Sequence, residues 1–269
     1  MVEWYAYLWS LLAITGVALL FWVVSLLRRD VSIVDSAWSL LFLSALVAYI
    51  AAGETAGPRT VLIVLLVTAW ALRLSAYITW RNWGEGEDRR YRAIRQKHQP
   101  GFAWKSLYIV FGLQGLLAWI IALPLVAAVS GSSAIGVLDY LGVAVWAMGM
   151  LFEAVGDQQL ANFKAKAGNR GRVMDQGLWR YTRHPNYFGE CCIWWGFYLI
   201  ALAAGGWWTL LSPLLMTLLL LRVSGVALLE RDIAERRPAY RHYVQRTSAF
   251  FPRPPRAVSE PLSNSGAQS

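Results

Sequence analysis

Long apolar runs recur along the chain, and short polar connections separate them. A run of about 20 apolar residues is long enough to cross the hydrocarbon core of a bilayer as an α-helix. The pattern predicts seven such helices, over residues 4–27, 32–52, 60–80, 104–130, 135–163, 187–204 and 208–229. We therefore expect an all-α, polytopic protein with one seven-span membrane domain over residues 1–256 and a disordered tail over 257–269.

The basic residues predict how these helices are oriented. The connections after the first, third and fifth runs, together with the C-terminal tail, hold nearly all the lysines and arginines, whereas the even-numbered connections hold only Arg59. Because cytoplasmic loops carry the excess of basic residues, the N-terminus is expected outside and the C-terminus in the cytoplasm. An odd number of spans requires the same arrangement. We expect a multi-pass protein of a bacterial inner membrane.

Composition agrees with this class and excludes others. The chain is 57% hydrophobic, and 15% of its residues are charged, against about 25% in soluble domains. The formal charge of +9 is placed in alternate loops, so it reports orientation and predicts no nucleic-acid partner. Glu3 precedes the first run and positive charge follows it, which is unlike a removable signal peptide. The three histidines share no metal-ligand spacing, so we expect no metal.

One polar segment, Gln176–Glu190, is dense in cationic side chains. Arg180, Arg183 and His184 directly precede an apolar helix that Pro185 can begin, since proline suits the first helical turn. Free N–H groups at that helix start would add to the positive charge. The segment therefore predicts a site for a phosphate-bearing or carboxylate-bearing cofactor. The alternative is a basic loop that only sets topology.

Ionisable residues at membrane depth are costly and often functional. Asp35 and Trp38 share a face near the cytoplasmic end of the second run, and Arg73 and Tyr77 share a face of the third. An Asp35–Arg73 ion pair between neighbouring helices is an alternative or additional interpretation. In the fifth run, carboxylates and amides follow one another at helical spacing, and they could accept hydrogen bonds from ribose hydroxyls and an adenine amine: Glu153, Asp157, Gln158 and Asn162.

The C-terminal segment 230–251 interleaves charges with aromatic residues. We expect a short helix, a turn at Pro238, and a segment that returns along the membrane surface. It forms either a lid or wall for the cofactor site or an amphipathic tail on the membrane.

Several segments together resemble the steroid 5α-reductase superfamily, and more closely its bacterial branch of membrane proteins. They are Ser32–Ser39, Trp80–Tyr91, Asp157, Gln176–Glu190 and Tyr240–Pro252. The resemblance covers about residues 30–255 and implies a seven-span reductase. Spans one to four, about residues 1–130, would enclose a hydrophobic substrate, and spans five to seven, about 131–256, would hold NADPH. The resemblance also implies a monomer that contacts membrane lipid.

The resemblance carries site residues over position by position. Asp157, Tyr181, Asn186, Glu190 and Arg222 match cofactor contacts of the family, Asn82 matches one after the third span, and Lys164 replaces an arginine. With the residues argued above, the expected cofactor-binding set is Asn82, Asp157, Asn162, Lys164, Arg172, Trp179, Tyr181, Arg183, His184, Asn186, Tyr187, Glu190, Arg222, Glu230 and Tyr240.

Two positions depart from the family pattern. The Gln-Glu pair of the steroid enzymes appears only as Asp35, and the expected catalytic tyrosine aligns with Trp70, while Tyr77 matches another tyrosine. Hydride transfer to a conjugated enone builds negative charge on the carbonyl oxygen, which a protonated or hydrogen-bonding Asp35, with Tyr77 or Arg73, could stabilise. These three are the expected catalytic residues, and Trp38 and Trp70 the expected substrate contacts.

The expected function is NADPH-dependent reduction of a C=C bond in a hydrophobic enone, a 3-oxo-Δ4-steroid or similar lipid. One alternative is an S-adenosylmethionine-dependent methyltransferase of a lipid or prenylcysteine, because membrane methyltransferases share the Arg183–Gly189 pattern. Those enzymes tend to carry paired glutamates where this chain has Glu230, Arg231 and Asp232. The other alternative is a non-catalytic lipid-binding membrane protein.

Overall fold

The computed structural model describes residues 2–53, 57–223, 226, 230 and 239–257. The described chain is helical, and the one bridge of extended backbone within it joins Thr182 to Ser248 in parallel. Among the described residues, five helices are long and apolar enough to span a membrane. They confirm the first five predicted runs: Trp4–Arg28 (α1), Ile33–Ala52 (α2), Pro58–Asn82 (α3), the composite Phe102–Val129, and Val137–Ala165 (α8).

Shorter elements complete the described helices. The composite span consists of α5 (Phe102–Ser106), a π-helix (Leu107–Gly112), α6 (Leu113–Ile121) and α7 (Leu123–Val129). The remaining helices are α4 (Arg89–Lys97), α9 (Pro185–Ala203), α10 (Leu211–Leu218), a second π-helix (Leu219–Val223) and α13 (Ala239–Arg246). Short 3₁₀ turns cover Ala167–Asn169, Gly177–Arg180 and Trp207–Leu210.

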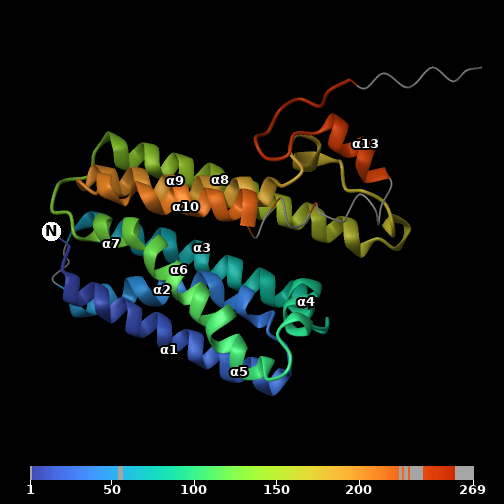
Figure 1. Ribbon diagram of the computed structural model, residues 1–269. Coiled ribbons are helices and arrows are strands. Elements are labelled where there is room, and N and C mark those ends of the chain that lie inside the picture. The colour runs from blue at the N-terminus through green and yellow to red at the C-terminus, as the bar shows by residue number, and fades with distance from the viewer. Residues whose placement is uncertain (1, 54–56, 224–225, 227–229, 231–238, 258–269) are drawn as a thin grey trace, which may run out of the picture. The chain divides into compact units, whose positions relative to one another are not determined.

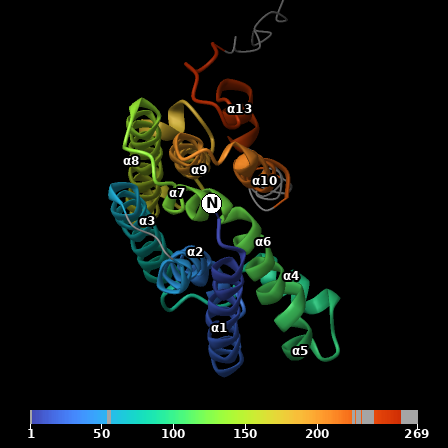
Figure 2. The ribbon, with the colours of Figure 1, turned by 90° about the vertical axis from the view of Figure 1, so that its left-hand side faces the viewer.

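The chain forms two compact units. Unit 1 consists of residues 1–146 and 194–216, and unit 2 of residues 147–193 and 217–269. In unit 1, α1 packs against α2 and α2 packs against α3, while α6 lies against α1 and α2 (Figures 1 and 2). Unit 1 thus extends past residue 130, the expected end of the substrate region.

The middle of unit 1 is packed with aromatic rings. Phe42, Trp70, Trp194 and Phe197 are each 0% exposed. Their ring centroids lie 4.6–6.3 Å apart at steep angles, an arrangement that aromatic quadrupoles favour. Because no solvent-sized space touches Trp70, this predicted substrate contact lines no open space in the structure.

A buried ion pair fastens one end of unit 1. Arg59 at the start of α3 makes two hydrogen bonds to Asp139, of 2.8 and 2.9 Å, and it also donates to the carbonyl oxygens of Ser133 and Ala134. Arg59 is 1% exposed and Asp139 is 0% exposed. A buried charge is tolerated when it is paired and fully hydrogen-bonded. The pair therefore ties α3 to the beginning of α8.

Glycines allow α8 and α9 to approach each other at backbone distance. In unit 2, a Cβ placed on Gly189 would lie 2.5 Å from the Gly149 carbonyl oxygen. In unit 1, a Cβ on Gly196 would lie 2.7 Å from the Gly142 carbonyl oxygen. Both pairs are spaced by seven residues along their helices, which keeps them on one face. Small residues at this seam let helix backbones pack closely in a membrane.

The seam continues toward the start of α9. A Cβ on Gly156, seven residues after Gly149, would lie 3.1 Å from the Pro185 ring and 3.3 Å from the Asn186 nitrogen. The seam therefore fixes α8 beside the first turn of α9.

We predict that Gly189→Ala destabilises the protein by about 1–3 kcal/mol, because the added methyl meets backbone atoms that cannot move aside cheaply. Gly16→Ala in α1 is the matched control, since a Cβ there meets nothing within 4 Å and alanine favours helix over glycine. Thermal unfolding of the detergent-solubilised variants measures both. Equal melting temperatures for Gly189→Ala and the wild type would contradict a close seam.

Candidate functional site

The cationic segment is anchored on α8. The backbone N–H of Leu178 donates to Gln159 Oε1 at 2.9 Å, and the indole N–H of Trp179 donates to the Gly156 carbonyl at 3.0 Å. Gly177 has a φ of +58° and the Gln159 side chain lies directly against it, so glycine serves both the backbone conformation and the close contact. This anchoring sets the position of the residues that lead into α9.

Glu230 is the anion that the cationic segment holds in this structure. Arg183 Nε and Nη2 donate to its two oxygens at 2.7 and 2.8 Å, a bidentate geometry. His184 Nε2 lies 2.9 Å from Glu230 Oε1, and the Tyr240 hydroxyl donates to the same oxygen at 3.1 Å. Arg183 and His184 are 8% and 5% exposed. An internal carboxylate thus occupies the cationic pair.

The C-terminal residues 239–256, here called the strap, pack on the same segment. Arg183 Nη1 donates to the Thr247 carbonyl at 2.6 Å, and the Arg183 backbone N–H donates to the Ser248 carbonyl at 2.9 Å. The Tyr243 hydroxyl donates to the Trp179 carbonyl. The strap therefore packs over the segment, and its role as a wall of a cofactor site stays a prediction.

These bonds change the expected role of Arg183 and His184. All three nitrogens of the Arg183 guanidinium donate to protein acceptors. The N–H groups expected to be free at the start of α9 are also used: those of His184 and Tyr187 donate to side chains of Thr182 and Asn186. Pro185 does begin α9, as predicted. Direct phosphate binding by Arg183 remains a prediction, and it requires exchange with Glu230.

Electrostatics explain why Glu230 stays ionised. Burial raises the pKa of its carboxyl, but hydrogen bonds from His184 and Arg183 and the charge of Arg183 outweigh burial and lower the pKa to about 2. The pKa of the Arg183 guanidinium is correspondingly raised by Glu230 despite burial. The pair is a charge-assisted interaction, which is stronger than a neutral hydrogen bond.

A second polar contact joins α8 to α9 beside the seam. Asn186 Nδ2 donates to Asp157 Oδ1 at 3.2 Å, and Asp157 is 4% exposed. Glu190, one turn further along α9, is also buried. Tyr187 stacks on the His184 ring at a centroid distance of 5.7 Å. The structure thus brings together five of the predicted cofactor residues of unit 2.

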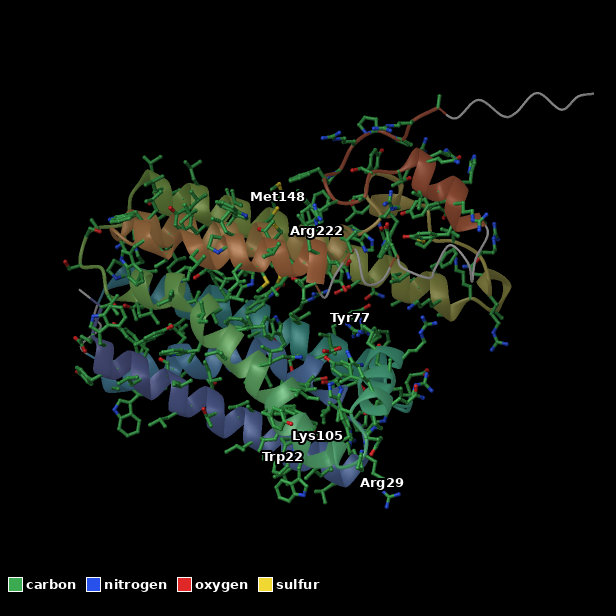
Figure 3. All side chains as sticks on the ribbon, in the orientation of Figure 1. Trp22, Arg29, Tyr77, Lys105, Met148 and Arg222 are labelled. Carbon is green, nitrogen blue, oxygen red and sulfur yellow. The ribbon has the colours of Figure 1, made fainter. Side chains whose placement is uncertain are left out.

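Four more predicted cofactor residues belong to the contacts described above: Trp179, Arg183, Glu230 and Tyr240. The others are exposed in unit 2 or lie in unit 1. In unit 2, five are exposed: Asn162, Lys164, Arg172, Tyr181 and Arg222. Arg222 belongs to the π-helix that follows α10 (Figure 3). Asn82 ends α3 in unit 1, where it accepts a hydrogen bond from Arg81. Among the described residues, no group of three or more His, Cys, Asp or Glu side chains could hold a metal ion.

Asp35 of unit 1 has a partner that the sequence did not identify. Its Oδ2 accepts from Arg90 Nη2 at 2.8 Å, and its Oδ1 accepts from the Tyr91 hydroxyl at 2.5 Å. Gln114 Nε2 in turn donates to the Tyr91 hydroxyl at 3.3 Å. Both oxygens of Asp35 therefore accept hydrogen bonds from the protein, and its catalytic role stays a prediction. The cation facing it is Arg90, where we expected Arg73.

The remaining predicted residues of unit 1 lie on α2 and α3. The Arg73 guanidinium lies 5.2 Å from the centre of the Tyr77 ring, a cation–π geometry. Trp38 is half-buried and meets Phe42 edge to face at 5.0 Å. The spacing of residues along the sequence does not link Arg90 and Tyr91 to Asp35, so they were not predicted as its partners. The available clue was the resemblance of Trp80–Tyr91 to the family.

We predict that the Arg183–Glu230 tie weakens in acid. Because the pKa of Glu230 is lowered from its ordinary 4.5 to about 2, its contribution to stability is complete above pH 4.5 and is lost as pH falls toward 2. Glu230→Gln should loosen the strap by about 2–3 kcal/mol at neutral pH. Hydrogen exchange of the strap amides measures this free energy. The difference between wild type and variant should disappear as the pH falls from 4.5 toward 2. A gap independent of pH would refute the ion pair.

Comparisons with known proteins place the chain in a family. The family described as "Protein of unknown function (DUF1295)" matches residues 21–247. The chain is 27% identical to "Uncharacterized protein C594.04c" of Schizosaccharomyces pombe over 263 residues, which cover 86% of this chain and 75% of that protein. No solved structure matches the chain. Because the family match covers most of the sequence, the chain belongs to the DUF1295 family.

Proposed function

We propose that the chain is an NADPH-dependent membrane reductase that saturates the conjugated C=C bond of a hydrophobic enone, such as a 3-oxo-Δ4-steroid or a similar lipid. The Asp157–Asn186 contact is the observation that carries the proposal. It places a carboxylate and an amide together beside the start of α9, with Tyr187 and Glu190 within one turn. DUF1295 is associated with steroid 5α-reductase-like proteins, which supports the same assignment.

The proposal completes the topology with two further spans. Helix α9 has 19 residues, close to the roughly 20 that a bilayer requires. The apolar segment Trp207–Val223 is the seventh. With the N-terminus outside, the strap and the segment before α9 face the cytoplasm, where nicotinamide cofactors are available.

In unit 2, the proposed roles divide by chemistry. Asp157 and Glu190 accept hydrogen bonds from ribose hydroxyls, and Asn186 holds Asp157 in position. The exposed cations Lys164 and Arg172 face phosphate oxygens, which arginine and lysine bind well. Arg183, paired with Glu230, fixes the wall of the site through the strap.

In unit 1, Asp35 has a positioning role. As an acceptor it orients the Arg90 guanidinium, and an oriented donor stabilises an oxygen on which negative charge develops. The Tyr91 hydroxyl proton is donated to Asp35 and helps to hold that carboxylate in place. NADPH would supply a hydride to the β-carbon, and a proton taken up at the α-carbon completes the saturated product. Arg73 and Tyr77 are a second pair of donors on the neighbouring helix α3.

An S-adenosylmethionine-dependent methyltransferase is the second candidate, because the Arg183–Gly189 pattern occurs in membrane methyltransferases. A glutamate that pairs with the motif arginine, as Glu230 does with Arg183, is compatible with that chemistry as well. The cofactor that binds decides between the two.

We predict saturable binding of NADPH to the purified chain, detected as quenching of tryptophan fluorescence. Asn186→Ala and Asp157→Ala should each weaken binding about tenfold or more, the loss expected when a buried hydrogen-bonding partner is removed. Gln245→Ala is the matched control, since its amide is exposed on α13. No binding of either nicotinamide cofactor rejects the reductase, and binding of S-adenosylhomocysteine instead favours the methyltransferase.

We further predict that Asp35→Asn lowers kcat at least about a hundredfold, the usual effect of losing an oriented donor that stabilises developing negative charge, while NADPH affinity is retained. Oxidation of NADPH in the presence of 3-oxo-Δ4-steroids measures turnover. Tyr91→Phe tests the positioning of Asp35, which accepts the Tyr91 hydroxyl proton, and Tyr77→Phe tests the Tyr77 hydroxyl as a donor to the carbonyl oxygen. An Asp35→Asn variant with wild-type kcat would exclude this carboxylate from the mechanism.

A further inference from the structure

Four arginines, of which Arg246 is half-buried and the other three are exposed, lie with two exposed aromatic side chains on unit 2. The strap residue Arg253 donates its backbone N–H to the Tyr181 carbonyl at 3.0 Å, and Arg256 donates to the Arg246 carbonyl at 2.9 Å. The Thr247 hydroxyl donates to the Arg180 carbonyl at 3.4 Å. These bonds hold the six residues of the surface in one place: Arg180, Tyr181, Arg246, Phe251, Arg253 and Arg256.

Among the described residues, no ion pair involves the four arginines of this surface, and no carboxylate belongs to it. Arg183 is the contrast, since Glu230 balances its charge. The two aromatic rings point outward: Tyr181 is 44% exposed and Phe251 is 58% exposed. A surface with exposed aromatic rings among cations favours a partner that carries negative charge and also has an apolar part.

The length of α8 places this surface at the edge of the bilayer. Helix α8 has 29 residues, more than the roughly 20 needed to cross the hydrocarbon core. Counted from Val137, the twentieth residue is Gly156. The Gly156 carbonyl accepts the Trp179 indole N–H, and Trp179 directly precedes Arg180. The surface therefore begins at the level where the hydrocarbon ends and the phosphates of the headgroups lie.

We propose that this surface docks the headgroups of anionic phospholipids in the membrane that the chain spans. Arginine forks bind phosphate oxygens, and aromatic rings are favoured at the interface between hydrocarbon and water. Juxtamembrane basic clusters are attracted to anionic leaflets. The proposal does not depend on the reductase assignment. Of the six residues of the surface, Tyr181 alone is also an expected cofactor contact.

The test compares lipids on the intact, detergent-solubilised chain. Short-chain phosphatidylglycerol and phosphatidylcholine are titrated separately, and bound lipid is counted by native mass spectrometry. We expect phosphatidylglycerol to bind at least about tenfold more tightly, with the preference falling as salt increases. The variant Arg180→Gln/Arg246→Gln/Arg253→Gln/Arg256→Gln should lose the preference. Equal binding of the two lipids by the wild type would overturn the proposal.

A matched variant separates this surface from overall charge. Arg92→Gln/Lys97→Gln/Lys166→Gln/Arg170→Gln removes the same four charges from exposed positions elsewhere and should retain the preference within twofold. An equal loss in both variants would overturn the proposal in favour of nonspecific attraction. Should the fourfold surface variant fail to fold, Arg253→Gln/Arg256→Gln gives the same comparison, with a smaller loss expected.

Competition with NADPH distinguishes the lipid from the cofactor as occupant. We expect NADPH to leave phosphatidylglycerol binding unchanged, and the surface variant to bind NADPH as the wild type does. Displacement of the lipid by NADPH, with loss of NADPH binding in the surface variant, would overturn the proposal and assign these arginines to the cofactor. Failure of NADPH to bind at all leaves the lipid comparison intact and counts only against the reductase.

Discussion

The close contact of the α8 and α9 backbones is the constraint on which the candidate site depends. At Gly149 and Gly189 there is no room for a side chain between the helices. Only this spacing brings the Asn186 amide within hydrogen-bond distance of Asp157. It also leaves the Gly156 carbonyl accessible to the Trp179 indole, so the polar segment before α9 is positioned by the same seam. In a bilayer, where lipid is as apolar as the helices, such packing is a principal source of helix association.

Three buried or half-buried arginines are each paired with a carboxylate of the protein. Arg59 is paired with Asp139, Arg183 with Glu230, and Arg90 with Asp35. Each pair joins a helix end or its flanking segment to a distant part of the same unit, and none requires a ligand to remain satisfied. Among the described residues, the strap arginines Arg246, Arg253 and Arg256 make no ion pair, so an anionic ligand can contact them without breaking one. Density of positive charge in the sequence did not distinguish these two groups.

The sequence predicted helices much better than it predicted partners. Five spans are confirmed because their length and apolar composition are local properties that the bilayer imposes. The start of α9 at Pro185 was predictable for the same reason, since proline marks a first helical turn. Partners of charged residues are long-range: Arg90 lies 55 positions from Asp35 and Glu230 lies 47 positions from Arg183. Nothing in the spacing of residues along one helix identifies such a pair.

The spacing of the seam glycines is visible in the sequence, but no helix contact was predicted from it. Gly142, Gly149 and Gly156 repeat every seven residues, as do Gly189 and Gly196. The apolar pattern of a membrane helix hides this period, because nearly every position is hydrophobic whichever way it faces. In such helices, the positions of small residues indicate which face contacts another helix. In soluble proteins, the pattern of polar and apolar residues gives the same indication.

The packing of unit 1 limits where a hydrophobic substrate can bind in it. Phe42, Trp70 and Trp194 are completely buried against one another, so the middle of the unit is filled by the chain itself. Trp38 and Tyr77 are only half-buried, and Trp38 lies one turn from Asp35. A substrate in unit 1 is therefore expected at the end of α2 and α3 that carries Asp35, and its reactive carbonyl meets oriented donors there without opening the aromatic core.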